Sequence, residues 1–199
     1  MALLRQREAH QMREPIRVAL PAEKTVLEAL RAGDEVRLWG VVYTARDATH
    51  ERIVAELRRS GVLPYGLQGQ VLFYAGPTPA RPGLPAGAIG PTTARRMDAW
   101  TPALLDAGVT ATIGKGARSE EVRRACVRNG AVYFAAVGGA AALLGSCVVA
   151  AEVVAWPELG TEALMRLTLE GLPAFVALDS VGGDLYASAP REWQMEVDE

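Results

Sequence analysis

Cationic and hydroxyl-bearing side chains gather at three points of the sequence where an apolar stretch gives way to a helical one. Ligands of α/β proteins bind beyond the carboxyl ends of strands and near helix N-termini, so these points are candidate binding loops. The first covers residues 44–50, where the Arg46 guanidinium can form a forked pair with a ligand carboxylate. A surface salt bridge from Arg46 to Asp47 or Glu51 is an equal alternative. His50 falls in the first turn of the following helix, where a structural role is favoured over a catalytic one.

The second loop covers residues 90–96 and combines a proline, two threonines and an arginine. Pro91 suits the first position of a helix, where its missing N–H group would be unpaired anyway. Thr92 and Thr93 would then present N–H and hydroxyl groups at the positive end of that helix. Arg96 follows them by four and three residues and therefore shares their face. The pattern predicts an anion site, and simple capping by threonine is the alternative.

The third loop covers residues 114–119 and places Lys115 between two glycines. Such a lysine either allows a ligand to approach closely or is an exposed turn residue. The loop is not a phosphate-binding P-loop, because Gly116 stands where Ser or Thr must bind magnesium. It does not match a dinucleotide fingerprint either, because Ser119 replaces the third glycine. Nucleotide binding is therefore not predicted.

The chain has two cysteines, Cys126 and Cys147, and both lie in apolar surroundings without Cys-x-x-Cys spacing. Neither a disulfide framework nor a cysteine-ligated cluster is predicted from them. No cluster of histidine and carboxylate residues suggests zinc. We therefore expect both cysteines to be packing residues and this chain to contribute no metal ligand.

The elements that must position these loops alternate between strands and helices. Alternating or continuous apolar runs predict strands at residues 16–20, 36–43, 71–74, 109–113, 131–135, 148–155, 167–169 and 174–178. Helical spacing and caps predict helices at residues 23–32, 47–60, 91–107, 119–128 and 140–144, with Asp47 and Ser119 as caps and Pro102 kinking or splitting the third. The four prolines within residues 76–90 predict a loop, and residues 179–184 a hairpin turn. This alternation predicts an α/β fold with a mixed sheet.

Length and composition indicate one globular domain, expected at residues 14–190, with a loose arm at 1–13 and a tail at 191–199. The net charge of −2 provides no field that would attract nucleic acid or an anionic membrane surface. Residues 131–151 carry no charge, but they are rich in Ala, Gly and Ser. They therefore predict a buried strand and helix instead of a membrane span. The first residues lack the apolar stretch of a signal peptide, so a cytoplasmic location is expected.

Several of these segments also occur, in this order, in one known family. They are residues 43–50, 76–79, 90–93 with Arg96 and Met97, 114–116 with Arg118 and Ser119, 131–134 with Gly138 and Gly139, 158–160 and 179–186. On them the chain resembles the β-subunit of two-subunit class I fumarases and L-tartrate dehydratases, which corresponds to the C-terminal domain of the single-chain enzymes. The likeness covers residues 14–186.

The resemblance implies a single swivelling β/β/α-type domain that works with a separate α-subunit, as a homodimer or heterotetramer. The α-subunit would supply three cysteines to a 4Fe–4S cluster. The implied reaction is the reversible hydration of fumarate to malate, a hydro-lyase reaction of the assembled enzyme. The implied substrate-binding residues are Arg46, Thr92, Thr93, Arg96 and Lys115. Thr92 and Lys115 are the implied catalytic residues.

Fumarate and malate are the expected substrates because residues 136–141 look closer to the fumarase version of this segment than to the tartrate dehydratase version. The alternatives are a β-subunit acting on L-tartrate or mesaconate, and a non-catalytic anion-binding module derived from one. Arg95 stands where the family often has a small residue. We expect its side chain to point into solvent.

Overall fold

The computed structural model describes residues 14–192. The predicted N-terminal arm lies outside the described residues, as does the predicted tail from residue 193 onward. The strands are β1 Ile16–Leu20, β2 Glu35–Thr44, β3 Val71–Phe73, β4 Ala75–Pro77, β5 Ile89–Pro91, β6 Ala111–Gly114, β7 Val132–Ala135, β8 Val148–Ala155 and β9 Leu164–Leu178. The α-helices are α2 Lys24–Ala29, α3 Asp47–Ser60, α4 Thr101–Asp106, α5 Glu120–Asn129, α6 Ala141–Ser146 and α7 Leu185–Glu192, and the 3-10 helices are η1 Pro64–Gly66, η2 Ala94–Met97 and η3 Pro157–Glu162.

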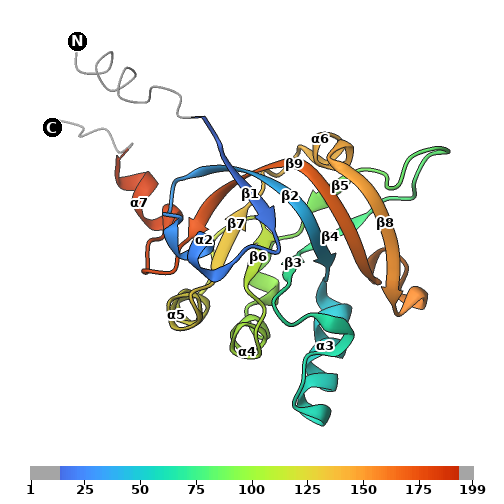
Figure 1. The fold of residues 1–199 in the computed structure, drawn as a ribbon, viewed down its shortest axis with the longest axis horizontal. Coiled ribbons are helices and arrows are strands. Elements are labelled where there is room, and N and C mark those ends of the chain that lie inside the picture. The colour runs from blue at the N-terminus through green and yellow to red at the C-terminus, as the bar shows by residue number, and fades with distance from the viewer. Residues whose placement is uncertain (1–13, 193–199) are drawn as a thin grey trace, which may run out of the picture.

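A seven-stranded mixed sheet in the order β1-β2-β3-β6-β7-β9-β8 forms the body of the molecule (Figure 1). The strands β1, β2, β3, β6 and β7 run parallel, and β9 runs antiparallel to its neighbours β7, β2 and β8. Because β9 pairs with both β2 and β7, the strands β2, β3, β6, β7 and β9 close into a ring. The predicted α/β fold with a mixed sheet is confirmed.

Two hydrophobic cores lie on opposite faces of this sheet. Val71 and Phe73 belong to the core inside the ring, whereas Leu72 and Tyr74 belong to the core under the helices. This division follows from the two-residue period of a strand, which sends successive side chains to opposite faces. The helices α3, α4 and α5 cover the second core on one side of the sheet (Figure 1).

The strand β9 corrects the prediction of two separate strands near the C-terminus. It is one continuous strand of 15 residues that contains Gly171 and Pro173. These residues normally interrupt a strand, but β9 pairs along its length with partners on both edges. Gly171 has φ +72°, and a Cβ atom there would lie 3.2 Å from the Trp39 ring. The glycine thus marks a close approach within the strand, and not its end.

The segment predicted as a helix at residues 91–107 also differs. Pro91 closes β5 and does not begin a helix, and the helical turn starts three residues later at Ala94. The predicted effect of Pro102 is confirmed, since it lies in the first turn of α4 and separates that helix from η2. The proline-rich loop before Pro91 is closed at its base, where β4 and β5 pair antiparallel.

One predicted cap is corrected as well, and one predicted turn is found with a different continuation. Asp47 is the first residue of α3 and not its cap, and Arg46 holds the cap position without a side-chain hydrogen bond. The predicted hairpin turn is closed by an antiparallel bridge between Leu178 and Asp184, but the chain then continues into α7 and not into a second strand. The Asp179 carboxylate holds this turn by accepting the backbone N–H groups of Val181 and Gly183 at 3.0 and 2.7 Å.

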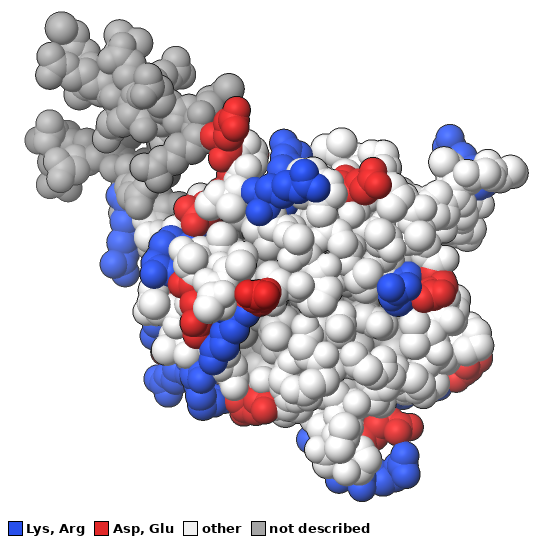
Figure 2. All heavy atoms as spheres, in the orientation of Figure 1, with Lys and Arg blue, Asp and Glu red and all other residues white. Residues whose placement is uncertain are grey.

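The uncharged stretch forms β7, the six-residue helix α6 and the start of β8, as the sequence predicts. None of the helices within residues 14–192 is long and apolar enough to span a bilayer. Figure 2 shows acidic and basic residues of both signs intermixed on one face of the molecule.

Candidate functional site

Four parallel strands place the predicted binding loops along one edge of the sheet. Thr44 of β2 is paired with Phe73 of β3, Phe73 with Ile113 of β6, and Ile113 with Phe134 of β7. Arg46 and Lys115 each lie two residues beyond this aligned row. Parallel strands end at the same edge, so the loops after β2, β3, β6 and β7 converge there.

Backbone hydrogen bonds join the second and third loops directly. Thr93 forms a parallel bridge with Lys115. The Lys115 N–H group donates to the Thr92 carbonyl at 3.1 Å, and the Ala94 N–H group donates to the Lys115 carbonyl at 2.8 Å. The structure therefore brings Thr92, Thr93 and Lys115 together, as the sequence predicts.

The prediction that Thr92 and Thr93 present free N–H groups at a helix N-terminus is wrong. Thr92 and Thr93 are extended, because their segment pairs with Lys115 before η2 begins. The Thr92 N–H group is already used, since it donates to the Tyr74 carbonyl at 2.6 Å. A helix N-terminus with free amides at Pro91 is therefore absent, and the polar groups left to the site there are mainly side chains.

The two predicted arginines already hold carboxylates of this chain. Arg96 forms a forked pair with Asp47, with Nε–Oδ1 at 3.1 Å and Nη2–Oδ2 at 2.5 Å. Arg46 lies 3.4 Å from Glu162 of η3, and not beside Asp47 or Glu51. Glu162 is anchored in turn because it accepts the Ala48 N–H group at 3.0 Å. Arg95 is exposed, as predicted.

Two buried polar atoms at the start of α3 lack a hydrogen-bond partner among residues 14–192: Arg46 Nε and His50 Nε2. His50 is fully buried and packs against Tyr74 and Trp100, with ring centroids 5.1 and 5.8 Å away. Its Nδ1 lies 2.8 Å from the Arg46 carbonyl, which can only accept, so Nδ1 carries the proton. Burial lowers the pKa of His50 from 6.5 to about 4. His50 thus supports the Arg46 loop from below, in line with the structural role favoured by sequence.

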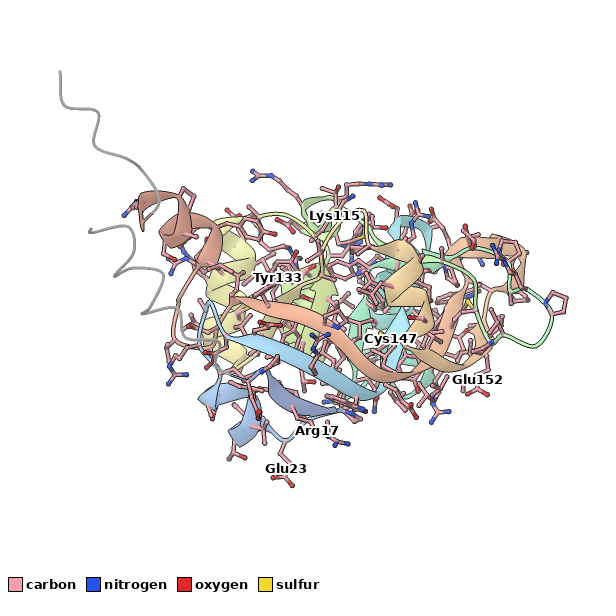
Figure 3. The ribbon with its side chains drawn as sticks, turned by 90° about the horizontal axis from the view of Figure 1, so that it is seen from above. Arg17, Glu23, Lys115, Tyr133, Cys147 and Glu152 are labelled. Atoms are coloured by element: carbon pink, nitrogen blue, oxygen red, sulfur yellow. The ribbon has the colours of Figure 1, made fainter. Side chains whose placement is uncertain are left out.

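Lys115 is the predicted site residue whose ammonium remains available, since it forms no salt bridge with a carboxylate of residues 14–192. Figure 3 shows it on the opposite side of the molecule from Arg17. Two tyrosines hold the two peptide groups on either side of Gly116, the residue that follows it. The Gly116 N–H group donates to the Tyr186 hydroxyl at 3.0 Å, and the Tyr133 hydroxyl donates to the Gly116 carbonyl at 2.9 Å.

A buried ion pair beneath the site was not predicted. The Arg118 side chain is fully buried, and its Nε lies 2.7 Å from Asp98. Arg118 also donates to Thr101 at 2.7 Å and stacks on Tyr133, with the guanidinium 4.8 Å from the ring centroid. Asp98 accepts the Ser119 N–H group at 2.6 Å, so this pair ties η2 to the Lys115 loop. The sequence signals for it were an arginine three residues after Lys115, at a helix start, and the place of Arg118 among the segments shared with the family.

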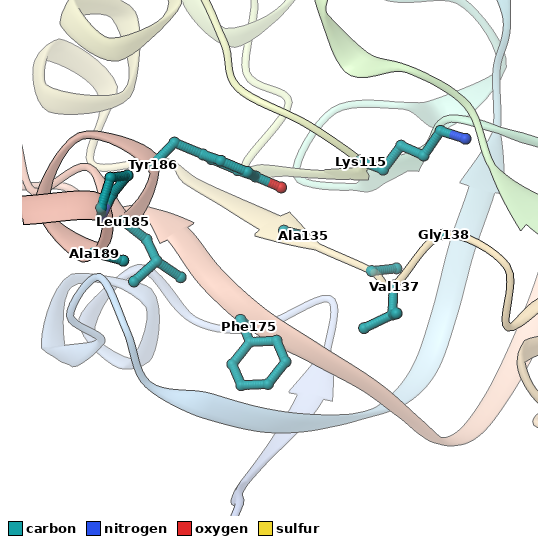
Figure 4. A pocket seen from close by; sticks show the side chains of 10 residues that line it. Lys115, Ala135, Val137, Gly138, Phe175, Leu185, Tyr186 and Ala189 are labelled. Atoms are coloured by element: carbon teal, nitrogen blue, oxygen red, sulfur yellow. The ribbon is translucent and has the colours of Figure 1, made fainter. Parts of the chain in front are cut away.

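A cavity of about 570 Å³ adjoins Lys115 between β7, β9 and α7 (Figure 4). Its walls are almost entirely apolar. They include Val137, Phe175, Leu185 and Tyr186. In Figure 4 the Lys115 side chain extends away from Tyr186 and past Gly138.

The described residues contain no group of three His, Cys, Asp or Glu side chains that could hold a metal ion. Cys126 is buried in the core under the helices, where burial raises its thiol pKa to about 12. Cys147 is partly buried and donates to the Leu143 carbonyl at 3.4 Å. Neither cysteine has the surroundings of a cluster ligand.

Comparisons with known proteins agree with the ordered motifs. The chain is 36% identical over 157 residues to fumarate hydratase 2 of Leishmania major, covering 78% of this chain and 28% of that protein. It is 36% identical over 151 residues to the anaerobic class I fumarate hydratase of Escherichia coli, covering 75% of this chain and 28% of the relative. The chain thus spans between a quarter and about a third of the fumarate hydratases it matches.

A third relative is matched almost end to end. This Methanocaldococcus jannaschii protein, whose naming as L(+)-tartrate dehydratase subunit beta is itself an inference, is 34% identical over 182 residues, which cover 88% of this chain and 93% of the relative. A family model described as Fumarase C-terminus matches residues 2–189. The resemblance seen in the sequence is therefore confirmed, and the chain belongs to the Fumarase C-terminus family.

Proposed function

We propose that this chain is the β-subunit of a cytoplasmic 4Fe–4S-dependent hydro-lyase that reversibly hydrates fumarate to malate. Its part is to bind the carboxylates of the substrate, and it works only with an α-subunit, in a homodimer or heterotetramer. The observation that carries the proposal is the convergence of Arg46, Thr92, Thr93, Arg96 and Lys115 at one edge of the sheet. The family supports the reaction class.

The carboxylates that now hold the two arginines do not exclude a substrate. The Arg96 side chain is 50% exposed and that of Asp47 is 32% exposed. Exposed pairs of this kind contribute about 0–1 kcal/mol, so little stability is lost when Asp47 gives up Arg96. A substrate carboxylate enclosed between two subunits would therefore compete successfully with Asp47 for Arg96. Before a substrate binds, Asp47 keeps the Arg96 guanidinium oriented.

Lys115 and Thr92 are proposed to act where charge develops. Removal of a proton beside a carboxylate moves negative charge onto that carboxylate, and a fixed ammonium group stabilises it. The Lys115 backbone is bonded to Thr92 and Ala94, so its starting point is fixed. Thr92 is half-buried beside it. We assign its hydroxyl a role in proton transfer that depends on Lys115, because an unassisted hydroxyl is a poor base.

The residues of this chain do not fit an iron–sulfur cluster. Cys126 and Cys147 belong to two different cores, and no group of three ligand side chains occurs within residues 14–192. The cluster is therefore assigned to the α-subunit in this proposal. The isolated chain is expected to be colourless and inactive, which iron analysis and a hydratase assay would test. A stoichiometric cluster, or turnover without a partner, would contradict this division of labour.

The site is tested by alanine variants in the assembled enzyme. Arg96→Ala and Lys115→Ala should each cost about 2–5 kcal/mol of transition-state stabilisation, measured as a fall in kcat/KM. The matched control is Arg95→Ala, because Arg95 is exposed and forms no salt bridge within the described part of the chain. It should behave like the wild type. Unchanged kinetics in both site variants would refute the proposed site, whereas an equal loss in Arg95→Ala would point to a general electrostatic effect.

L-tartrate is the second candidate substrate, because the relative matched over 93% of its length carries that name. Malate and tartrate differ by one hydroxyl group, which a site can discriminate only by hydrogen-bonding it. Among the other polar residues of the matched loops, Thr49 donates to the Glu162 carbonyl and the Thr78 hydroxyl accepts the Ala88 N–H group at 2.9 Å, so both are already engaged. Comparing kcat/KM for malate, tartrate and mesaconate would decide, and a preference for either of the last two would change the substrate but not the reaction class.

A further inference from the structure

Gly138 lies where the chain leaves β7, and the Lys115 side chain passes directly over it (Figure 4). A Cβ atom added to Gly138 would lie 3.3 Å from Lys115 Cδ and 3.8 Å from Lys115 Nζ. Apart from the two neighbours of Gly138 in the chain, no other residue among 14–192 would come within 4 Å of it. The space left by the missing side chain is therefore occupied by Lys115 alone.

The backbone at Gly138 does not itself require glycine. Its φ is not in the left-handed region, whereas Gly139 next to it has φ +84°. Gly76, over which the Arg46 side chain passes, is different again, because a Cβ there would lie 2.4 Å from the Thr161 carbonyl as well as 3.2 Å from Arg46. At Gly138 an added methyl group would disturb one side chain and leave the backbone unstrained.

The rest of the Lys115 residue is held firmly. Its N–H and carbonyl groups are hydrogen-bonded to Thr92 and Ala94, and the N–H and carbonyl groups of the following Gly116 are hydrogen-bonded to Tyr186 and Tyr133. The freedom that remains is in the four-carbon side chain. Fixing such a stem costs lysine rotamer entropy, so the direction of the side chain depends on what surrounds it.

Lysine is rare in this chain. The chain has 21 lysine and arginine residues in all, and only Lys24 and Lys115 are lysines. Lysine presents a compact point charge on a slim stem, whereas arginine needs room for a planar fork. A slim side chain fits against the backbone of Gly138, which has no side chain of its own.

We propose that Gly138 is a positioning residue that sets the direction of the Lys115 ammonium group. The contact between the two residues stands on geometry alone, and its catalytic consequence rests on the proposed function. A side chain at position 138 would lift the lysine stem from its path and displace the ammonium from the substrate carboxylate. Gly138 would then contribute to the reaction without touching the substrate.

The kinetic test is a double-mutant cycle in the assembled enzyme. Gly138→Ala should lower kcat/KM by about tenfold, since displacements of about 1 Å can cost about a hundredfold and the shift required here is smaller. Gly138→Val should lower it further, because its γ-carbons reach deeper into the lysine path. In the Lys115→Ala background neither change should cause an additional loss. Equal effects in both backgrounds, or wild-type kinetics in Gly138→Val, would overturn the proposal.

The second test needs no activity. Labelling the isolated full chain with lysine that carries 13C at its ε-carbon should give two ε-carbon signals in an NMR spectrum, one from each lysine. The variant Lys24→Arg identifies the Lys115 signal by removing the other. Gly138→Ala and Gly138→Val should shift and broaden the Lys115 signal while leaving that of Lys24 in place. An unchanged Lys115 signal in both variants would refute the positioning role. If the wild-type complex proved inactive, the proposed function would fail, and this spectrum would still decide whether Gly138 positions the lysine.

Discussion

Lowering the pH from 6.5 towards 4 should destabilise the isolated chain through His50. The imidazole is fully buried, donates from Nδ1 to the Arg46 carbonyl at 2.8 Å, and has a buried Nε2 atom without a partner among the described residues. Burial lowers its pKa from 6.5 to about 4. Between these values the unfolded chain binds a proton at His50 and the folded chain does not. Stability from this residue is therefore complete above pH 6.5 and is lost as the pH falls.

The size of the effect follows from the same two pKa values. Each pKa unit corresponds to 1.36 kcal/mol, so the gap between 6.5 and about 4 amounts to about 3 kcal/mol of unfolding free energy. Urea unfolding curves at several pH values between 7.5 and 4.5 would measure it. The control is His50→Asn, whose amide can still donate to the Arg46 carbonyl but does not titrate.

The difference between the two proteins isolates His50 from the carboxyl groups that they share. The wild type should lose up to about 3 kcal/mol more than His50→Asn as the pH falls through this range. If the unfolding free energies of the two proteins fell by the same amount as the pH is lowered, the His50 pKa would not be lowered in the folded chain. That result would refute the inference that the imidazole is held neutral under the Arg46 loop.

Three further outcomes test the buried ion pair, the hydrogen bond to Gly116 and the packing role of Cys126. Asp98→Asn should lower the unfolding free energy measured in urea by about 3–5 kcal/mol, because it leaves the buried Arg118 charge without its counter-ion; a loss below about 1 kcal/mol would contradict the buried pair. Tyr186→Phe should speed hydrogen exchange of the Gly116 amide and cost about 1 kcal/mol, and unaltered exchange would mean that the bond is not made in solution. Cys126→Ala should cost about 1 kcal/mol, as for loss of a methyl-sized group, and leave the iron content of the assembled enzyme unchanged; lost iron in a folded variant would make Cys126 a ligand.

Elements with strong local signals are predictable from this sequence. Helix α3 has the predicted bounds, with a left-handed Gly61 at its end, and α5 begins after Ser119, whose side chain accepts the Val122 N–H group. Caps and left-handed glycines act within one helical turn, so neighbouring residues contain the information. The strands β1 and β8 likewise match their predicted bounds.

Features that depend on distant partners could not be predicted in this way. The extended path of Thr92 and Thr93 results from a bridge to Lys115, which competes with the helix that Pro91 suggests locally. The candidate cations could be named because they follow strands that end at one edge. Their carboxylate partners could not, since Arg96 and its partner Asp47 are 49 residues apart, and Arg46 pairs with Glu162 near the other end of the chain.

The late position of the long strand β9 in the chain also determines when, during synthesis, the sheet edge that carries the binding loops can form. β2 is paired with β9 from Glu35↔Phe175 to Thr44↔Met165, so the ring stays open until these late residues have left the ribosome. Before that, β2 and β7 expose unpaired backbone groups that can recruit other chains. Pairings this distant in sequence also make folding slow. A nascent or truncated chain that lacks β9 would therefore carry every proposed binding residue and still be a target for aggregation and chaperones.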